Sequence, residues 1–212
     1  MKKLISILVG TLMLLSLAGC GAAKPEATVE KFFAAAQKLD AEKMASTLVP
    51  SNTEDIKDIK SMLSTEQVPE EQVVLYEYLS EYLKSNAGKM TFKVTGSEIN
   101  GDNAVITVDC KYVDAGPVFK ATMGALMQKM LSLAFSGAEI AEEQTSQMFV
   151  DTMREQANSM SETFKETTVK VNCIKQDDIW YISETTDEML DVVTSGFVTA
   201  AKDMGGIFEG AN

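Results

Sequence analysis

The stretch Ala104-Val105-Ile106-Thr107-Val108-Asp109-Cys110-Lys111-Tyr112 decides the fold, because its apolar and polar side chains alternate. Such alternation predicts a β-strand with one buried face and one exposed face. Residues Met90 to Val94 alternate in the same way, and Asn100-Gly101 lies between the two runs. Asn-Gly favours the tight turn of a β-hairpin. The sequence therefore predicts two antiparallel strands here.

A second pair of strands is expected further along the chain. Val169, Val171 and Cys173 alternate with polar residues, and the apolar run 179–182 follows a turn at Gln176-Asp177-Asp178. Two such runs around a turn predict another hairpin. Together the four strands form a curved antiparallel sheet in our prediction.

The segments before and after the sheet have helical spacing. Before it, apolar residues recur every three to four positions in 27–39, in a short stretch capped by Asp40, around Ile56 and Ile59, and in a stretch that starts near Pro69 and ends at Gly88.

After the last strand, Thr185 and Glu188 fit a capping box, and Gly205-Gly206 suits a helix end. We expect a single α+β domain over 27–212. Its N-terminal helices pack on a curved four-stranded antiparallel sheet, with a helical hairpin inserted between strands two and three and a C-terminal helix.

The inserted segment, 117–164, is predicted to be a helical hairpin broken at Ser136-Gly137. Its first arm is apolar on more than one face, whereas its second arm is amphipathic, so one arm cannot cover all of the other. Flexible methionines suit a surface that accepts a partner, although apolar residues at helical spacing are more often ordinary core. The candidate partner face consists of Met123, Met127, Met130, Phe135, Met148 and Phe149.

The first twenty residues have the pattern of an export signal. Met1-Lys2-Lys3 is cationic, Leu4 to Leu17 is almost wholly apolar, and Leu17-Ala18-Gly19-Cys20 follows. The apolar run is shorter than the roughly 20 residues that span a bilayer, so a cleaved signal is preferred over a membrane-spanning anchor. The segment resembles the signal peptide and lipobox of bacterial lipoproteins.

That resemblance implies a signal peptide at 1–19 and a lipidated tether at 20–26. The Cys20 thiol would receive a diacylglyceryl group, and the new amino terminus a further acyl chain such as palmitate. Two or more chains make anchoring stable. The expected location is the extracytoplasmic side of the cell membrane. In the alternative, Cys20 is incidental to an ordinary secretory signal.

Charge narrows the choice of partners. The chain has a net charge of −12, and cleavage after residue 19 removes Lys2 and Lys3 and no acid, which changes the net charge to −14. A protein this acidic lacks the basic footprint that nucleic acid requires. An anionic membrane surface would also repel it, so only the acyl chains attract it there.

A second resemblance concerns the domain itself. The run Val29-Glu30-Lys31-Phe32-Phe33-Ala34-Ala35-Ala36 with Asp40, and the Lys175 to Ile182 hairpin with Trp180, resemble small bacterial lipoproteins that have a nuclear-transport-factor-two-like, or cystatin-like, domain. This resemblance implies helices packed into a cone-shaped sheet. The chain departs from the family at Asp178, where the family's turn has Gly, and in the long insertion. Such cones host many activities, so function transfers poorly.

The catalytic sets of most hydrolases are missing from the sequence. It contains no histidine, which excludes Ser-His-Asp and Cys-His systems and His-bearing metal sites. No Gly-rich phosphate loop and no CxxC pair occurs either. The second resemblance implies that an enzyme on such a fold often uses a buried carboxylate beside a tyrosine or histidine. Tyr112 and Tyr181 are the tyrosines near the sheet, and a tyrosine in a sheet is more often packing than chemistry. Asp177-Asp178 is better read as a solvated turn.

Cys110 and Cys173 form a candidate disulfide, because both lie on the apolar face of a strand and exported proteins can keep such bonds. Two buried free thiols are the equally weighted alternative.

These observations predict a membrane-anchored extracytoplasmic lipoprotein that serves as a non-catalytic accessory or binding module of the cell envelope. One alternative is a cone-shaped domain that binds a small molecule or lipid for a transporter, and a weaker one is an enzyme that works without histidine. No cofactor or metal is expected. The expected partners are the membrane, through acyl chains on Cys20, and a protein or apolar ligand at the hairpin.

Overall fold

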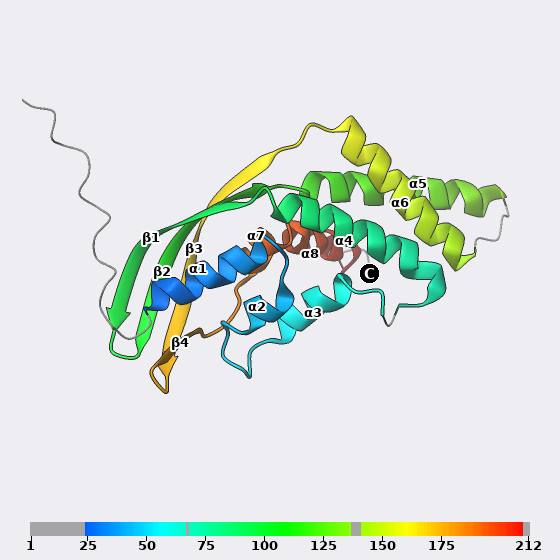
Figure 1. Ribbon diagram of the computed structural model, residues 1–212. Helices are drawn as coiled ribbons and strands as arrows, with labels where there is room; N and C mark the ends of the chain where they lie inside the picture. The colour runs from blue at the N-terminus through cyan, green and yellow to red at the C-terminus, as the bar shows by residue number, and fades with distance from the viewer. Residues whose placement is uncertain (1–23, 67, 137–140, 210–212) are drawn as a thin grey trace, which may run out of the picture.

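The computed structural model describes residues 24–66, 68–136 and 141–209, and it contains the expected α+β architecture. A four-stranded antiparallel sheet has the order β1-β2-β3-β4. The strands are β1 (Thr91–Asn100), β2 (Asn103–Val113), β3 (Phe164–Gln176) and β4 (Ile179–Ile182). Figure 1 shows that the long strands curve and that the helices lie on one side of them. Cys20, the signal at 1–19 and most of the tether lie outside the described residues.

The alternating residues of β2 give the strand one buried face and one exposed face, as predicted. Ile106 and Val108 are fully buried and lie opposite Val171 and Val169 of β3, which are also buried. The other face is polar, where Thr168 donates a hydrogen bond to Asp109 at 2.7 Å. One face of the sheet therefore carries the core, and the other face meets solvent.

Both hairpin turns use left-handed backbone. Gly101 has φ 61° between β1 and β2, and Asp177 and Asp178 have φ 48° and 63° between β3 and β4. Two successive left-handed residues match a type I′ turn, and aspartate tolerates that conformation better than most residues. Asp178 also accepts a hydrogen bond from Lys175 at 2.7 Å. The absence of Gly at 178 therefore does not prevent the turn.

The helices before the sheet are α1 (Pro25–Ala36), α2 (Ala41–Ala45), α3 (Glu54–Met62) and α4 (Val73–Ala87). Asp40 caps α2 as predicted, accepting a hydrogen bond from the Lys43 N–H at 3.0 Å. The predicted start of the fourth helix near Pro69 is wrong by a few residues. Pro69 precedes a 3-10 turn, η1 (Glu70–Gln72), and α4 begins only after it.

The end of the chain differs from the prediction in three ways. It forms two helices, α7 (Asp187–Val193) and α8 (Phe197–Glu209), and α8 continues through Gly205-Gly206. The cap of α7 is Thr186, which accepts a hydrogen bond from the Met189 N–H at 3.3 Å, whereas Thr185 donates to Asp55. The two helices are separated because Ser195 and Gly196 have positive φ angles, which no helix continues through.

The insertion forms a helical hairpin made of α5 (Gly116–Ser136) and α6 (Glu142–Ser159), as predicted. The predicted end of the hairpin at Phe164 is wrong, because α6 ends at Ser159 and Phe164 is the first residue of β3. Residues 137–140 between them lie outside the described residues. Among the helices that the structure describes, none is both long enough and apolar enough to cross a membrane.

Candidate functional site

The root of the hairpin belongs to the core, and its outer part does not. Val150 and Met153 of α6 are buried, as is Leu126 of α5. Beyond this root, Met127, Met130, Leu131 and Phe135 of α5 are 48%, 41%, 53% and 90% exposed. Their spacing along α5 places them on one face of the helix. We call these four residues the apolar tip.

The six residues of the predicted partner face differ in their exposure. Met127, Met130 and Phe135 are exposed. Met123, Met148 and Phe149 are only partly exposed, and Phe149 packs against the core. Leu131 was not among the predicted residues, although its position four residues after Met127 would have indicated it.

The apolar tip lies at one end of the elongated domain. Figure 1 shows α1, where the described chain begins, beside the β1–β2 turn, while the far ends of α5 and α6 extend from the opposite end. The Thr28 hydroxyl of α1 donates to the Trp180 carbonyl at 3.1 Å, which fixes the start of α1 against β4. The tip and the attachment point of the N-terminal segment are therefore at opposite ends.

A second feature is an apolar cavity of about 370 Å³ within the helical layer. Helices α3, α4, α5, α7 and α8 all contribute to its wall, so no single segment of sequence indicates it. The rings of Phe119 and Phe197 meet edge to face at 4.9 Å between centroids on one side. Asp55 and Asp58 are the charged residues in its lining. We call this space the helical cavity; its apolar wall includes Ile59, Leu79, Leu83, Phe119, Phe197 and Val198.

A smaller cavity of about 210 Å³ lies at the root of the hairpin and is lined by both polar and apolar residues. Lys89 and Glu162 in its lining form an ion pair with each other. Asn86 is buried, and its amide nitrogen has no hydrogen-bond partner among the described residues. Burial is the main reason that the pKa of the nearby Tyr82 is raised, and Glu162 adds to it. Because Lys89 is paired with Glu162 and the rest of the lining is mixed, this cavity does not favour one class of ligand.

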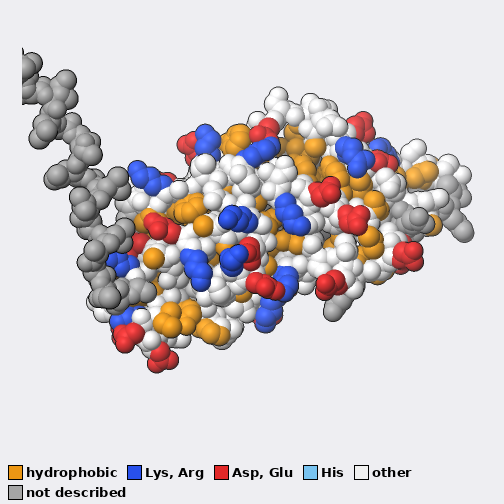
Figure 2. Space-filling view, in the orientation of Figure 1, with side chains coloured by type: hydrophobic (Ala, Val, Ile, Leu, Met, Phe, Trp, Pro, Cys, Tyr) orange, Lys and Arg blue, Asp and Glu red, His pale blue; other side chains and the backbone are white. Residues whose placement is uncertain are grey.

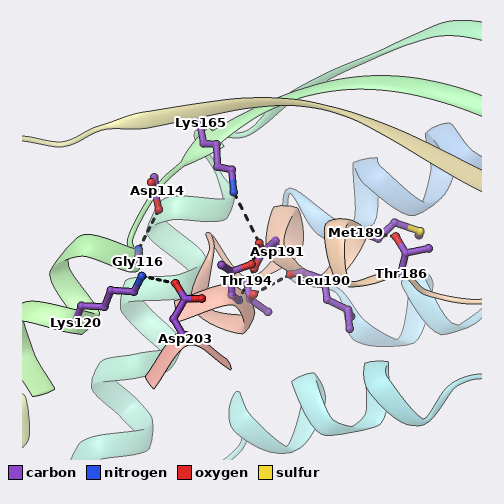
Figure 3. Close-up of polar contacts among 11 residues, drawn as sticks. Asp114, Gly116, Lys120, Lys165, Thr186, Met189, Leu190, Asp191, Thr194 and Asp203 are labelled. Atoms are coloured by element: carbon purple, nitrogen blue, oxygen red, sulfur yellow. Dashed lines mark hydrogen bonds and ion pairs between the residues drawn. The ribbon is translucent and has the colours of Figure 1, made fainter. Parts of the chain in front are cut away.

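A buried carboxylate beside a tyrosine does exist, at Asp191 and Tyr112. Burial raises the pKa of Tyr112, and the charges of Asp191 and Asp114 raise it further. Asp191 accepts hydrogen bonds from the backbone N–H of Thr199, at 2.8 Å, and from the Thr199 hydroxyl. Figure 3 shows Asp191 at the junction of α7 and α8, with Lys165 approaching it.

The bonding of this cluster indicates a structural role. The Thr199 N–H belongs to the first turn of α8, so Asp191 caps that helix from a distance. Asp114 similarly accepts a hydrogen bond from the Gly116 N–H at 3.2 Å, at the start of α5. These carboxylates are committed to helix starts. In addition, no three His, Cys, Asp or Glu side chains within 24–66, 68–136 and 141–209 could share a metal ion.

The candidate disulfide between Cys110 and Cys173 is wrong. In the β2–β3 register, Cys110 lies opposite Thr167 and Cys173 lies opposite Ala104. The two cysteines are thus separated by six positions along the strands, or about 20 Å, whereas a disulfide needs α-carbons within about 7 Å. Both cysteines are free and buried.

Both buried thiols are expected to be unreactive in the folded protein. Burial raises the pKa of each to about 12, with smaller contributions from Asp109 at Cys110 and from Glu26 at Cys173. At pH 8 only about one thiol in ten thousand would be the reactive thiolate. Iodoacetamide labelling followed by mass spectrometry should modify neither residue in the native chain and both in urea without reductant. If both cysteines stayed unlabelled in urea, the two would form a disulfide after all.

These features define the class: an α+β domain with an apolar cavity among its helices and an apolar hairpin tip. No protein-family model matches the chain, and no curated protein matches it. Among solved structures, the chain is similar to the crystal structure of a "putative lipoprotein (ycdA)" from Bacillus subtilis subsp. subtilis str. 168. The identity is 18%, the TM-score is 0.40, and the match covers 82% of this chain and 58% of that one.

At that identity and TM-score, the similarity carries no argument about function, and it covers less than two thirds of the other chain. The likeness to the nuclear-transport-factor-two-like domains stays a prediction. Any functional assignment therefore depends on the residues of this chain.

Proposed function

We propose that this protein is a lipoprotein anchored on the extracytoplasmic side of the cell membrane, where its folded domain is a non-catalytic binding module of the envelope. The observation that carries the proposal is Leu17-Ala18-Gly19-Cys20 directly after an apolar run with a cationic start. Acyl chains on Cys20 would hold the domain at the membrane.

The position of the apolar tip supports a binding role away from the membrane. Extended chain from Gly21 to Pro25 reaches at most about 18 Å, so the end of the domain near α1 stays close to the bilayer. The apolar tip at the opposite end then projects outward. Four exposed apolar side chains on one helix face suit a groove on a partner protein. The partner in this proposal is a protein.

The charge distribution on one face of the domain supports a binding module that does not take up nucleic acid or an anionic membrane surface there. Lys and Arg side chains are interspersed with Asp and Glu on the face in Figure 2, without a continuous basic patch there. The ion pairs are mostly on the surface, such as Lys57 with Glu54 and Lys202 with Asp187.

Changing Cys20→Ala is expected to abolish membrane anchoring, because the acyl chains have no other attachment site in the lipobox. Fractionation with metabolic labelling by a fatty acid should show an unlabelled chain that is either unprocessed or released. Ser6→Ala, inside the apolar run, is the matched control and should leave anchoring unchanged. A Cys20→Ala chain that is anchored, labelled and processed like the parent would refute the lipoprotein proposal.

A further inference from the structure

The helical cavity is the feature that the proposed function does not use. We infer that it binds a single-chain amphiphile with a cationic headgroup, the alkyl chain inside the cavity and the head at Asp55 and Asp58. This inference does not depend on anchoring through Cys20 or on the apolar tip.

The walls of the cavity determine the chemistry of what enters it. A volume of about 370 Å³ is within the roughly 300–1,000 Å³ that small-molecule sites occupy. Its wall is built almost wholly of apolar side chains, which offer water no hydrogen bonds. Burial of an alkyl chain removes apolar surface from water on both sides and is favourable there.

The cavity is held open by residues that are fixed elsewhere. Leu83 of α4 and Ile59 of α3 are buried in the main core while also lining the cavity. Phe197 packs between the rings of Phe119 and Tyr82. A binding site whose walls are already packed loses little conformational entropy on binding.

The charged residues select the headgroup. Asp55 and Asp58 lie three positions apart on α3, so they share one face of that helix. Both are exposed, and among the described residues neither has a Lys or Arg within ion-pair distance. The lysines of α3 are paired elsewhere: Lys57 with Glu54 and Lys60 with Glu42.

An ammonium head placed there gains two carboxylates, whereas a carboxylate head would be repelled by both. The net charge of −12 adds to the same preference. The alkyl chain of a neutral amphiphile would pack against the apolar walls, but its head would form no ion pair with Asp55 or Asp58. Affinity for the helical cavity should therefore be highest for a cationic head, lower for a neutral head and lowest for an anionic head.

The test uses photoreactive dodecyl probes that differ only in their head: ammonium, hydroxyl or carboxylate. The full chain is placed in phosphatidylcholine nanodiscs and labelled, and the crosslinked peptides are mapped by mass spectrometry. Each probe is compared only with itself between variants, so its partition into the bilayer cancels. The ammonium probe should label peptides of α4 and α8.

Ala201→Trp tests the location, because Ala201 is an exposed residue of α8 in the cavity lining. The new indole should occupy the mouth and reduce labelling of those peptides about tenfold, which corresponds to a loss of about one unit in log affinity. Ala134→Trp, at an exposed alanine of α5 that does not line the cavity, is the control. Equal labelling of the Ala201→Trp variant would overturn the inference.

Asp55→Asn with Asp58→Asn tests the headgroup and changes only exposed side chains, so it remains informative if Ala201→Trp unfolds the chain. Labelling by the ammonium probe should fall about threefold, a typical effect for exposed charge pairs, while labelling by the hydroxyl probe stays constant. Added salt should reduce the advantage of the ammonium probe in the parent. An unchanged ratio of ammonium to carboxylate labelling in the double variant would rule out the cationic head.

Discussion

Replacing Asp191 with alanine is expected to lower the free energy of unfolding by about 2 to 3 kcal/mol, because it removes a buried carboxylate together with both of the hydrogen bonds that tie it to α8. Asp191 is 5% exposed and accepts two hydrogen bonds from Thr199, one of them from a backbone N–H in the first turn of α8. Lys165, at 4.0 Å, would also lose its counter-charge. Urea unfolding should show a lower midpoint with an unchanged m-value.

Asp187→Ala is the matched control for this prediction. Asp187 is also an aspartate of α7, and it pairs with Lys202 of α8. Unlike Asp191, however, Asp187 and its partner Lys202 are both exposed. An exposed pair of this kind contributes less than about 1 kcal/mol. If the two variants were equally stable, the buried junction would not hold α7 and α8 together as described.

Making the apolar tip polar is expected to abolish retention of the partner protein without unfolding the domain. The variant combines Met127→Gln, Met130→Gln, Leu131→Gln and Phe135→Ser, all at exposed positions, so the core loses nothing. Burial of the four side chains against a partner would contribute several kcal/mol at about 25 cal/mol per Å². The measurement is a pull-down of the acylated protein from its own membranes, with the unfolding midpoint measured alongside.

Point substitutions are used because deleting 117–164 would also remove Val150 and Met153 from the core and unfold the domain. Ile99→Gln with Ile179→Gln is the control, since both isoleucines are about half exposed. They belong to β1 and β4, at the turn end of the sheet. A folded tip variant that still captured the partner would exclude the apolar tip as the binding face.

The sequence was sufficient for several elements whose pattern is local. Alternation predicted β2 and the face that it buries, and Asn100-Gly101 predicted its turn. Helical spacing predicted α1 and the two arms of the hairpin, α5 and α6. These predictions succeed because a strand or helix places its side chains by a fixed period, whatever lies around it.

Predictions failed where residues far apart in the sequence determine the local structure. A single closing helix was expected, but Asp191 reaches across the junction to cap α8, and Ser195 and Gly196 turn the chain there. The disulfide was plausible on two apolar faces, yet the register separates Cys110 from Cys173. The register depends on how two whole strands pair, and the sequence around each cysteine does not indicate that pairing.

The sequence by itself determined the α+β class and the order of its elements, because periods are read from neighbouring residues. In the same way it predicts an export signal at 1–19, directly before Cys20. Only the tertiary structure decided where the apolar tip lies relative to α1, and that Asp55 of α3 and Phe197 of α8 line the same cavity. Residues about 140 positions apart meet there through helix packing, whose geometry depends on the shapes of all the side chains between them.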